Sequence, residues 1–304
     1  MDIDRALVAS AAQKLRVAGI ESADHDASRL LEFAHSVSEF DQLIAQRSLR
    51  IPLQHLTGTA YFRHLALNVG PGVFIPRPET ELLAQVAIDA LPRILQQRLS
   101  DAEVKATVTK PTVFDLCSGS GAVALSVATE LANVTVHAVE VSAEALPWLL
   151  RNVEAHSEKF QEQNSRVTVH CLDATESEKF HEWFNTVDVV LSNPPYIPDA
   201  MIPREPEVRD HDPHLALFGG HDGLEVPVKV AQVAAELLID GGIFGMEHAD
   251  VQGEGDFGLP AALRNMTDSS GAVVWRDVTD HLDYNGLPRF TTAIRTNRAT
   301  QMQG

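Results

Sequence analysis

The chain has 304 residues, of which 44% are hydrophobic, and it carries 42 acidic against 24 basic residues, for a formal net charge of −18. This length and apolar content predict a main domain of about 200 residues together with a smaller one. The acidic excess argues against a protein that holds nucleic acid by its phosphate backbone, because that task requires a basic face, and it favours basic protein partners.

Other features of the composition point to an intracellular enzyme. No signal peptide is expected at the N-terminus, and no apolar run is long enough to cross a bilayer, so no membrane partner is expected. The two cysteines, Cys117 and Cys171, are too few for a disulfide framework, which predicts a reducing, cytoplasmic location. The 13 histidines lack metal-ligand spacing; we interpret His211, His214 and His221 as polar loop groups and expect no metal.

Residues 1–60 have the pattern of a small helical domain. Apolar residues recur every four positions from Ile3 to Leu15, ahead of Gly19, which indicates an amphipathic helix that a glycine ends. We interpret the apolar stripes as core, with contact to a substrate protein as an additional role. The other helices expected here cover residues 22–34, 38–47 (with Ser38 as N-cap) and about 52–58.

Residues 61–78 are expected to form a β-hairpin that links the two domains. The pattern is β-like on both sides of residues 68–72, where Asn, Gly and Pro gather and predict the turn. Residues 79–296 are expected to be the catalytic domain. The tail, 297–304, has no apolar pattern and is expected to be frayed.

The catalytic domain alternates apolar strands with helices, which predicts an α/β, Rossmann-like fold with a mostly parallel sheet. The last two strands are expected to be antiparallel neighbours. Strands are expected from 112 and at 134–140, 166–171, 187–192, 242–247, 272–278 and 289–295. Helices are expected at 79–95, from about 121, and at 143–155, 224–239 and 259–266.

A turn of small residues follows the first of these strands. Gly119 and Gly121 would let a ligand approach the backbone, and the helix that opens at about Gly121 would direct N–H groups at an anion. A carboxylate or a ribose would suit such a pocket. The candidate cofactor contacts in this turn are Asp115, Cys117, Ser118, Gly119, Ser120 and Gly121.

Two acidic residues at later strand ends extend this pocket. Glu140 ends the second strand about 20 residues beyond the glycine turn, the spacing at which an acid grips a ribose diol. Asp173, in the loop after the third strand, is a candidate acceptor for an adenine amine, with a turn-capping role as the alternative. Ala174 beside it is also a candidate cofactor contact.

The tetrapeptide Asn193-Pro194-Pro195-Tyr196 follows the apolar run 187–192, where a buried strand would deliver it to the sheet edge. Two prolines have fixed φ and no amide hydrogen, so they make this loop stiff. The Asn193 side-chain carbonyl and the Pro194 backbone carbonyl could accept both hydrogens of one planar –NH2 group, with Tyr196 as an aromatic wall. A simple loop stop is the alternative for a bare Pro-Pro pair.

The glycine turn, Glu140 and this tetrapeptide, in this order, resemble the class I S-adenosylmethionine-dependent methyltransferases that modify planar nitrogens. Residues 58–83, which contain Phe74-Ile75-Pro76-Arg77-Pro78-Glu79-Thr80-Glu81, are similar to a signature of the HemK/PrmC family, the peptide chain release factor glutamine methyltransferases. Residues 205–208 and 213–224 are similar to that family's later segment. Cys117 departs from the family pattern, which often has glycine there, so a positive φ at Cys117 would be strained.

The resemblance implies a reaction, its cofactor and its partners. The enzyme would transfer the methyl group of S-adenosylmethionine to the side-chain nitrogen of the glutamine in the Gly-Gly-Gln motif of release factors, which act in translation termination. Asn193, Pro194 and Tyr196 would be catalytic, and Asn193 would also touch the cofactor. Pro195 and Phe74 would complete the substrate site. We expect direct transfer without a general base, with the rate gained from orientation and charge stabilisation.

Two other functions fit parts of this pattern. An adenine exocyclic-amine methyltransferase acting on DNA or RNA would present the same –NH2 group to the same acceptors. The acidity and the flanking signatures disfavour it, so no direct nucleic-acid contact is expected. A binding module without turnover is disfavoured by the intact tetrapeptide. A reactive thiol at Cys117 is disfavoured because no basic partner is identifiable. Arg77 is assigned to architecture or interdomain pairing, and not to catalysis.

Overall fold

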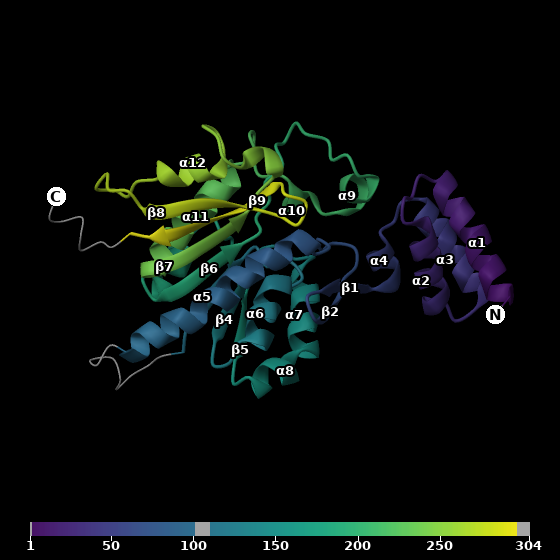
Figure 1. Ribbon diagram of the computed structural model, residues 1–304, viewed down its shortest axis with the longest axis horizontal. Coiled ribbons are helices and arrows are strands. Elements are labelled where there is room, and N and C mark those ends of the chain that lie inside the picture. Colours follow the sequence, from purple (N-terminus) through teal and green to yellow (C-terminus); the bar gives the residue numbers. More distant parts are fainter. Residues whose placement is uncertain (1, 101–109, 297–304) are drawn as a thin grey trace.

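Residues 2–100 and 110–296 are described by the computed structural model of the chain, so the predicted tail at 297–304 lies outside the described residues. Four helices near the N-terminus stand apart from the rest of the molecule (Figure 1). They pack around their own core, in which Leu15, Leu30 and Phe40 are at most 1% exposed. These helices are α1 (Asp2–Val17), α2 (Ala23–Phe33), α3 (Val37–Ser48) and α4 (Leu53–Thr57).

The start of α3 corrects one prediction, because its N-cap is Ser36 and not Ser38. The backbone of Ser36 is extended, and its side-chain oxygen accepts a hydrogen bond from the Glu39 amide at 3.1 Å. Ser38 already lies inside the first helical turn, so it cannot cap that turn. At the end of the helical segment, α4 stops as predicted at Gly58, which has the left-handed φ of 67° that glycine tolerates.

The predicted hairpin is present, but its predicted turn at 68–72 is wrong. The hairpin consists of β1 (Thr59–Phe62) and β2 (Leu65–Asn68), which pair antiparallel. The turn is therefore at residues 63–64, where Arg63 has a φ of 51°. Two carboxylates hold this unusual conformation: the Arg63 amide donates to Glu81 at 2.8 Å, and its guanidinium donates to Glu130 at 2.6 Å. Because both partners are distant in sequence, no local pattern marked this turn.

A seven-stranded sheet forms the centre of the larger part of the molecule, in the order β5-β4-β3-β6-β7-β9-β8. The strands β3 to β7 are parallel, and β9 pairs antiparallel with both β7 and β8, as predicted for the last two strands. Every residue of the central β6 is buried. The strands are β3 (Thr112–Leu116), β4 (Thr135–Val139), β5 (Arg166–His170), β6 (Val187–Ser192), β7 (Leu238–Glu247), β8 (Trp275–Leu282) and β9 (Pro288–Arg295).

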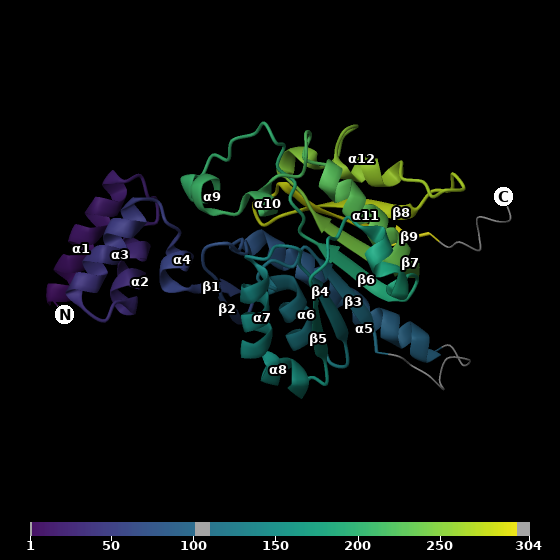
Figure 2. The same ribbon diagram turned by 180° about the vertical axis from the view of Figure 1, so that it is seen from behind.

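Helices cover both faces of this sheet (Figures 1 and 2), and each face has its own apolar core. One layer contains α5 (Glu81–Ser100), α6 (Ala122–Glu130), α7 (Leu146–Ala155) and α8 (Ser157–Glu162). The other contains η2 (Ser177–Trp183), α11 (Glu225–Leu237) and α12 (Leu259–Arg264). Short helices η1 (Pro78–Thr80), α9 (Pro206–His211), α10 (His214–Leu217) and η3 (Asp250–Gln252) lie in connecting segments. Among the described helices, none is both long and apolar enough to span a membrane.

The strand order places the predicted functional segments at one edge. The chain continues from β3 outward to β4 and β5, and then returns to the other side of β3 with β6. Ligands of open α/β sheets bind at such a reversal, beyond the carboxyl ends of the strands. The glycine turn, Glu140, Asp173 and Asn193 each follow one of these four strands, so the topology gathers them at the same edge.

Candidate active site

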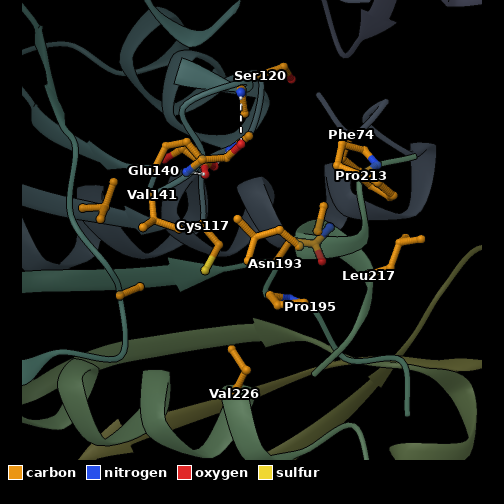
Figure 3. A pocket seen from close by; sticks show the side chains of 18 of the residues that line it. Phe74, Cys117, Ser120, Glu140, Val141, Asn193, Pro195, Pro213, Leu217 and Val226 are labelled. Atoms are coloured by element: carbon orange, nitrogen blue, oxygen red, sulfur yellow. Dashed lines mark hydrogen bonds between the residues drawn. The ribbon is translucent and has the colours of Figure 1, made fainter. Parts of the chain in front are cut away.

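A cavity of about 380 Å³ lies at the carboxyl edge of the parallel strands. Figure 3 shows Cys117 and Glu140 on one side of it and Phe74 and Leu217 on the other, with Asn193 between them. Most of the predicted site residues line this cavity. They are Phe74, Asp115, Cys117, Ser118, Gly119, Ser120, Glu140, Asp173, Ala174, Asn193, Pro195 and Tyr196. Gly121 and Pro194 do not line it.

Gly119 leaves the backbone of the turn open to a ligand, whereas Gly121 serves packing. No atom lies within 4 Å of the position that a Cβ on Gly119 would take. A Cβ on Gly121 would lie 2.6 Å from the Leu149 side chain, and Gly121 also has a φ of 85° as the N-cap of α6. Both positions favour glycine through a left-handed φ, which is 55° at Gly119, and at Gly121 close packing is a second reason.

Asp115 is fully buried and caps α6 from within. Its carboxylate accepts a hydrogen bond from the Ala124 amide, in the first turn of the helix, at 3.0 Å. Burial raises the pKa of this carboxyl to about 7, although the hydrogen bonds from Ser118 and Ala124 act to lower it. Asp115 therefore fixes the shape of the turn. It also accepts from one of the helix N–H groups that were predicted to face a ligand.

Cys117 adopts the conformation that was anticipated as strained, with a φ of 66°. A left-handed conformation costs a non-glycine residue roughly 1–2 kcal/mol. Burial, followed by the negative charge of Glu140, raises the pKa of the Cys117 thiol far above its ordinary value. The thiol is therefore protonated at neutral pH, in agreement with a structural role and not a nucleophilic one.

Glu140 joins the glycine turn to the segment after β4. One carboxylate oxygen accepts from the Gly119 amide at 2.8 Å and the other from the Ser142 amide at 2.7 Å. Burial raises the pKa of Glu140, while these backbone hydrogen bonds act to lower it. Each oxygen retains a lone pair, so a Glu140 carboxylate held in this way can still accept ribose hydroxyls.

Asp173 also lines the cavity. Its Oδ1 atom accepts hydrogen bonds from both the amide and the hydroxyl of Thr175, at 2.8 and 2.7 Å. This is the turn-capping arrangement that was the alternative interpretation of Asp173. The two roles are compatible, because capping uses Oδ1 and a carboxylate has a second oxygen.

The tetrapeptide is held by two hydrogen bonds from its side chains. Asn193 Nδ2 donates to Thr80 Oγ1 at 3.2 Å, and the Tyr196 hydroxyl donates to Glu247 Oε1 at 3.2 Å. Glu247 is 2% exposed, and burial raises its pKa to about 7. Hydrogen bonds from Thr80 and Tyr196 and the charge of Arg289 lower that pKa, because each favours the carboxylate.

Thr80 and Glu247 are functional candidates that the sequence reasoning did not single out. Thr80 lies inside the signature 74–81, in which only Phe74 and Arg77 were given roles. Glu247 is the last residue of β7 and Glu140 directly follows β4, so the position at a strand end was the available signal.

The signature at 213–224 is explained by close packing against the tetrapeptide. Ile197 and residues 217–219 form a short parallel pairing, with hydrogen bonds of 2.8 and 2.9 Å. A Cβ on Gly223 would lie 2.2 Å from the Tyr196 carbonyl oxygen. This pairing places Leu217 and Phe218 on the cavity wall.

Phe74 and Arg77, at the end of the segment 61–78, both line the cavity. The Arg77 guanidinium lies 5.0 Å from the centre of the Phe74 ring and donates to Asp212 at 2.8 Å. Burial raises the pKa of Asp212 to about 6, and the charge and hydrogen bond of Arg77 oppose this. The contacts of Arg77 are thus those of an architectural residue that fixes the Phe74 ring.

Comparison with known proteins identifies relatives along the whole chain. The family model described as "Methyltransferase small domain" matches residues 79–202. A release factor glutamine methyltransferase of Streptomyces coelicolor is 43% identical, over 96% of this chain and 98% of its own length. One of Bifidobacterium longum is 39% identical, over 82% of this chain and 88% of its own. A 4-amino-L-phenylalanine/4-methylamino-L-phenylalanine methyltransferase of Streptomyces pristinaespiralis is 34% identical, over 70% of this chain and 66% of its own.

Proposed function

The chain belongs to the release factor glutamine methyltransferases, and on that premise we propose that the glutamine it modifies is that of the Gly-Gly-Gln motif of peptide chain release factors. It is an S-adenosylmethionine-dependent protein-glutamine N-methyltransferase with the class I methyltransferase fold. The HemK/PrmC resemblance is confirmed by these relatives, and the adenine-modifying alternative is not favoured.

One observation carries the site assignment: Glu140 and Asn193 line the same cavity. The Glu140 carboxylate suits a ribose, and the Asn193 amide suits a planar –NH2 group. Glu140 and Gly119 would hold the nucleoside part of the cofactor, since Gly119 leaves its backbone open and Glu140 is fixed beside it. Asp173 would meet the adenine. When bound, S-adenosylmethionine supplies an electrophilic methyl group on sulfur. Asn193, Pro195 and Tyr196 border the same cavity and would hold the substrate.

The contribution of the chain is to orient a poor nucleophile. An amide nitrogen shares its lone pair with its carbonyl, so it attacks carbon slowly unless both partners are aligned. Asn193 Oδ1 would accept one N–H of the substrate and strengthen that bond as positive charge develops on nitrogen. A nitrogen–carbon bond forms, the carbon–sulfur bond breaks, and the nitrogen then loses one proton to solvent. Pro194 itself does not line the cavity, but we propose its carbonyl as the second acceptor because Pro194 lies between Asn193 and Pro195, which both line it.

We propose that the helical domain, residues 1–60, contacts the release factor. In this proposal residues 61–78 are the linker and residues 79–296 the catalytic domain. Two arginines of this segment, Arg47 and Arg50, bind Glu207 on α9 at 2.8 and 2.6 Å, so the helices are tied to a segment that borders the cavity. The acidic chain suits a basic protein partner, and no direct nucleic-acid contact is proposed. A cytoplasmic location is part of this proposal, because release factors act in translation.

Mass spectrometry of a purified release factor incubated with the enzyme and isotopically labelled cofactor tests the proposal. We expect one labelled methyl group on the motif glutamine and none on a release factor with glutamate at that position. Asn193→Ala should bind cofactor normally and abolish transfer. Label on an oligonucleotide or on 4-aminophenylalanine, with unmodified release factor, would contradict the assignment. Near wild-type turnover by Asn193→Ala would remove the role of that residue.

A further inference from the structure

The side chain of Gln252 connects three segments that meet at the tetrapeptide. Gln252 lies on η3, is 5% exposed and does not line the cavity. Its Nε2 atom donates to the Tyr196 carbonyl oxygen at 2.9 Å, and its Oε1 atom accepts from the Ala249 amide at 3.0 Å. A longer contact of 3.5 Å joins the same Nε2 atom to the Asp222 carbonyl oxygen. One buried carboxamide thus links the segment after β7, the tetrapeptide and the signature at 213–224.

The polarity of these contacts fixes the orientation of the carboxamide. A backbone N–H can only donate and a backbone carbonyl can only accept, so neither partner can exchange its role. Rotation of the Gln252 amide by half a turn would place Oε1 against the Tyr196 carbonyl oxygen and Nε2 against the Ala249 amide. Both pairs would then repel each other. Gln252 therefore holds the backbone of Tyr196 by a hydrogen bond of defined direction.

The glycine at position 223 leaves space for this hydrogen bond. A Cβ on Gly223 would lie 2.2 Å from the Tyr196 carbonyl oxygen and 2.7 Å from Gln252 Nε2, which are the two bonded atoms. The φ of 79° at Gly223 is a second reason for glycine there. Any other residue at this position would displace the donor or the acceptor, so the signature at 213–224 permits the contact between Gln252 and Tyr196.

The other contacts of this part of the loop do not hold the Tyr196 carbonyl. The Tyr196 hydroxyl donates to Glu247 at the far end of the side chain, at 3.2 Å. The short pairing with residues 217–219 is made by the backbone of Ile197, one residue later. Among the described residues, no group other than Gln252 donates to the Tyr196 carbonyl oxygen.

Resting on the proposed function, we infer that Gln252 is a positioning residue for methyl transfer. It holds the backbone at Tyr196, and the two prolines before Tyr196 transmit that position to Asn193. Because Pro194 and Pro195 have fixed φ, they cannot absorb a displacement as a flexible loop would. The Asn193 amide and the Pro194 carbonyl, which are the proposed acceptors of the substrate N–H groups, therefore keep their positions only while Tyr196 is held.

Activity assays on the full-length enzyme, with release factor and S-adenosylmethionine both saturating, test this inference. Gln252→Met keeps the approximate length of the side chain but removes its amide donor and acceptor. It should lower kcat at least about tenfold, because small misplacements at a reacting centre are costly. The dissociation constant of S-adenosylmethionine should stay almost unchanged, because Gln252 lies outside the cavity. A wild-type kcat in folded Gln252→Met would overturn the inference.

Gln252→Glu tests the direction of the hydrogen bond and serves if Gln252→Met does not fold. A carboxylate can still accept from Ala249 but cannot donate to Tyr196, whereas a protonated carboxyl has one O–H that can donate. The kcat of this variant relative to wild type should therefore rise as the pH is lowered from about 8 to about 6, because burial raises a carboxyl pKa. Glu247 and Asp280 titrate in both enzymes, so the ratio isolates the new carboxyl. A ratio independent of pH in folded Gln252→Glu would overturn the inference.

Two controls separate positioning from general damage and from the proposed function. Ser165→Ala removes another buried side chain that bridges two backbone groups, the Leu131 carbonyl and the Val134 amide, and it does not line the cavity. This variant should lose stability in urea unfolding but keep the wild-type kcat. An equal loss of kcat in Ser165→Ala would overturn the inference, because kcat would then report general damage. A wild-type enzyme that does not methylate the release factor glutamine would instead contradict the proposed function.

Discussion

Gly219 lies so close to the tetrapeptide that a Cβ atom on it would sit 2.5 Å from the carbonyl oxygen of Pro195. The same atom would meet the Gly223 carbonyl oxygen at 2.5 Å and the Tyr196 Cα at 2.9 Å. All three are backbone atoms, which cannot move aside as a side chain can. The backbone of Gly219 therefore sets the position of the substrate-binding loop.

Gly219→Ala should displace residues 195–196 and lower kcat at least about tenfold, because small misplacements at a reacting centre are costly. It should also destabilise the fold by about 1–3 kcal/mol through overpacking. Activity assays and urea unfolding measure the two effects. Gly271→Ala is the control, since a Cβ there meets no atom within 4 Å and only its φ of 84° is unfavourable. Unchanged kcat in Gly219→Ala would show that the loop adapts.

Glu140→Ala should weaken cofactor binding about 10- to 100-fold, or about 1.4–2.7 kcal/mol, because it removes the proposed ribose acceptor and leaves the Gly119 and Ser142 amides unpaired. Glu140→Gln should have an intermediate effect. Titration calorimetry with S-adenosylmethionine gives the dissociation constants, with the exposed Glu154→Ala as control. A dissociation constant equal to that of the wild type would exclude the ribose contact.

Glu207→Gln should raise the KM for the release factor while changing kcat little. Glu207 binds Arg47 and Arg50, so the variant loosens the connection between the helical segment and α9. Breaking this partly buried ion pair should cost about 1–3 kcal/mol of stability. Glu205→Gln, an exposed change in the same segment, is the control. A KM that stays constant in Glu207→Gln would speak against docking through the helices.

The same ion pairs predict a pH dependence. Burial raises the pKa of Glu207, but the hydrogen bonds from Arg50 and Arg47 outweigh it and hold this pKa below its ordinary value. A carboxyl with a lowered folded-state pKa stabilises the protein above its unfolded pKa, and this stabilisation is lost as the pH falls through the folded pKa. The stability difference between wild type and Glu207→Gln should therefore shrink in acid.

Because of His137, we expect the free energy of unfolding to decrease as the pH is lowered from 6.5 to about 4. Burial, followed by the charges of His170 and Arg166, lowers its pKa to about 4, and its ring stacks on Phe114 at 4.5 Å. Since the unfolded chain then binds a proton more readily than the folded one, stability is full above about pH 6.5 and declines below it. The lowered pKa of His170 acts in the same direction.

Urea unfolding at pH 7 and pH 5 measures this effect. His137→Phe, which preserves a stacked ring, should lose less stability on acidification than the wild type. The exposed His35→Gln serves as the control. Equal losses in wild type and His137→Phe would mean that His137 does not contribute to acid sensitivity.

Much of the fold and most of the site could be predicted because their signals are local. Apolar runs located the parallel strands, and β6 was predicted with its observed bounds, Val187–Ser192, whereas β7 begins at Leu238 and not at the predicted residue 242. The motifs at strand ends converge on one edge by topology alone. The hairpin turn was predicted wrongly because Glu81 and Glu130, which are distant in sequence, stabilise it through Arg63. The N-cap of α3 was predicted wrongly because it lies two residues earlier than expected, at Ser36 and not at Ser38.

By itself, the sequence determined which groups meet at the carboxyl edge, because these follow from residue types at short spacings. It determined the family and the reaction through the resemblance of its motifs to a known family. Only the tertiary structure decided which way those groups face. Thr80 and Asn193 are 113 residues apart along the chain, and Glu247, which accepts from Tyr196, is the last residue of β7. No sequence period couples such positions. A hydrogen bond has a direction, and folding alone brings together the donors and acceptors that impose it.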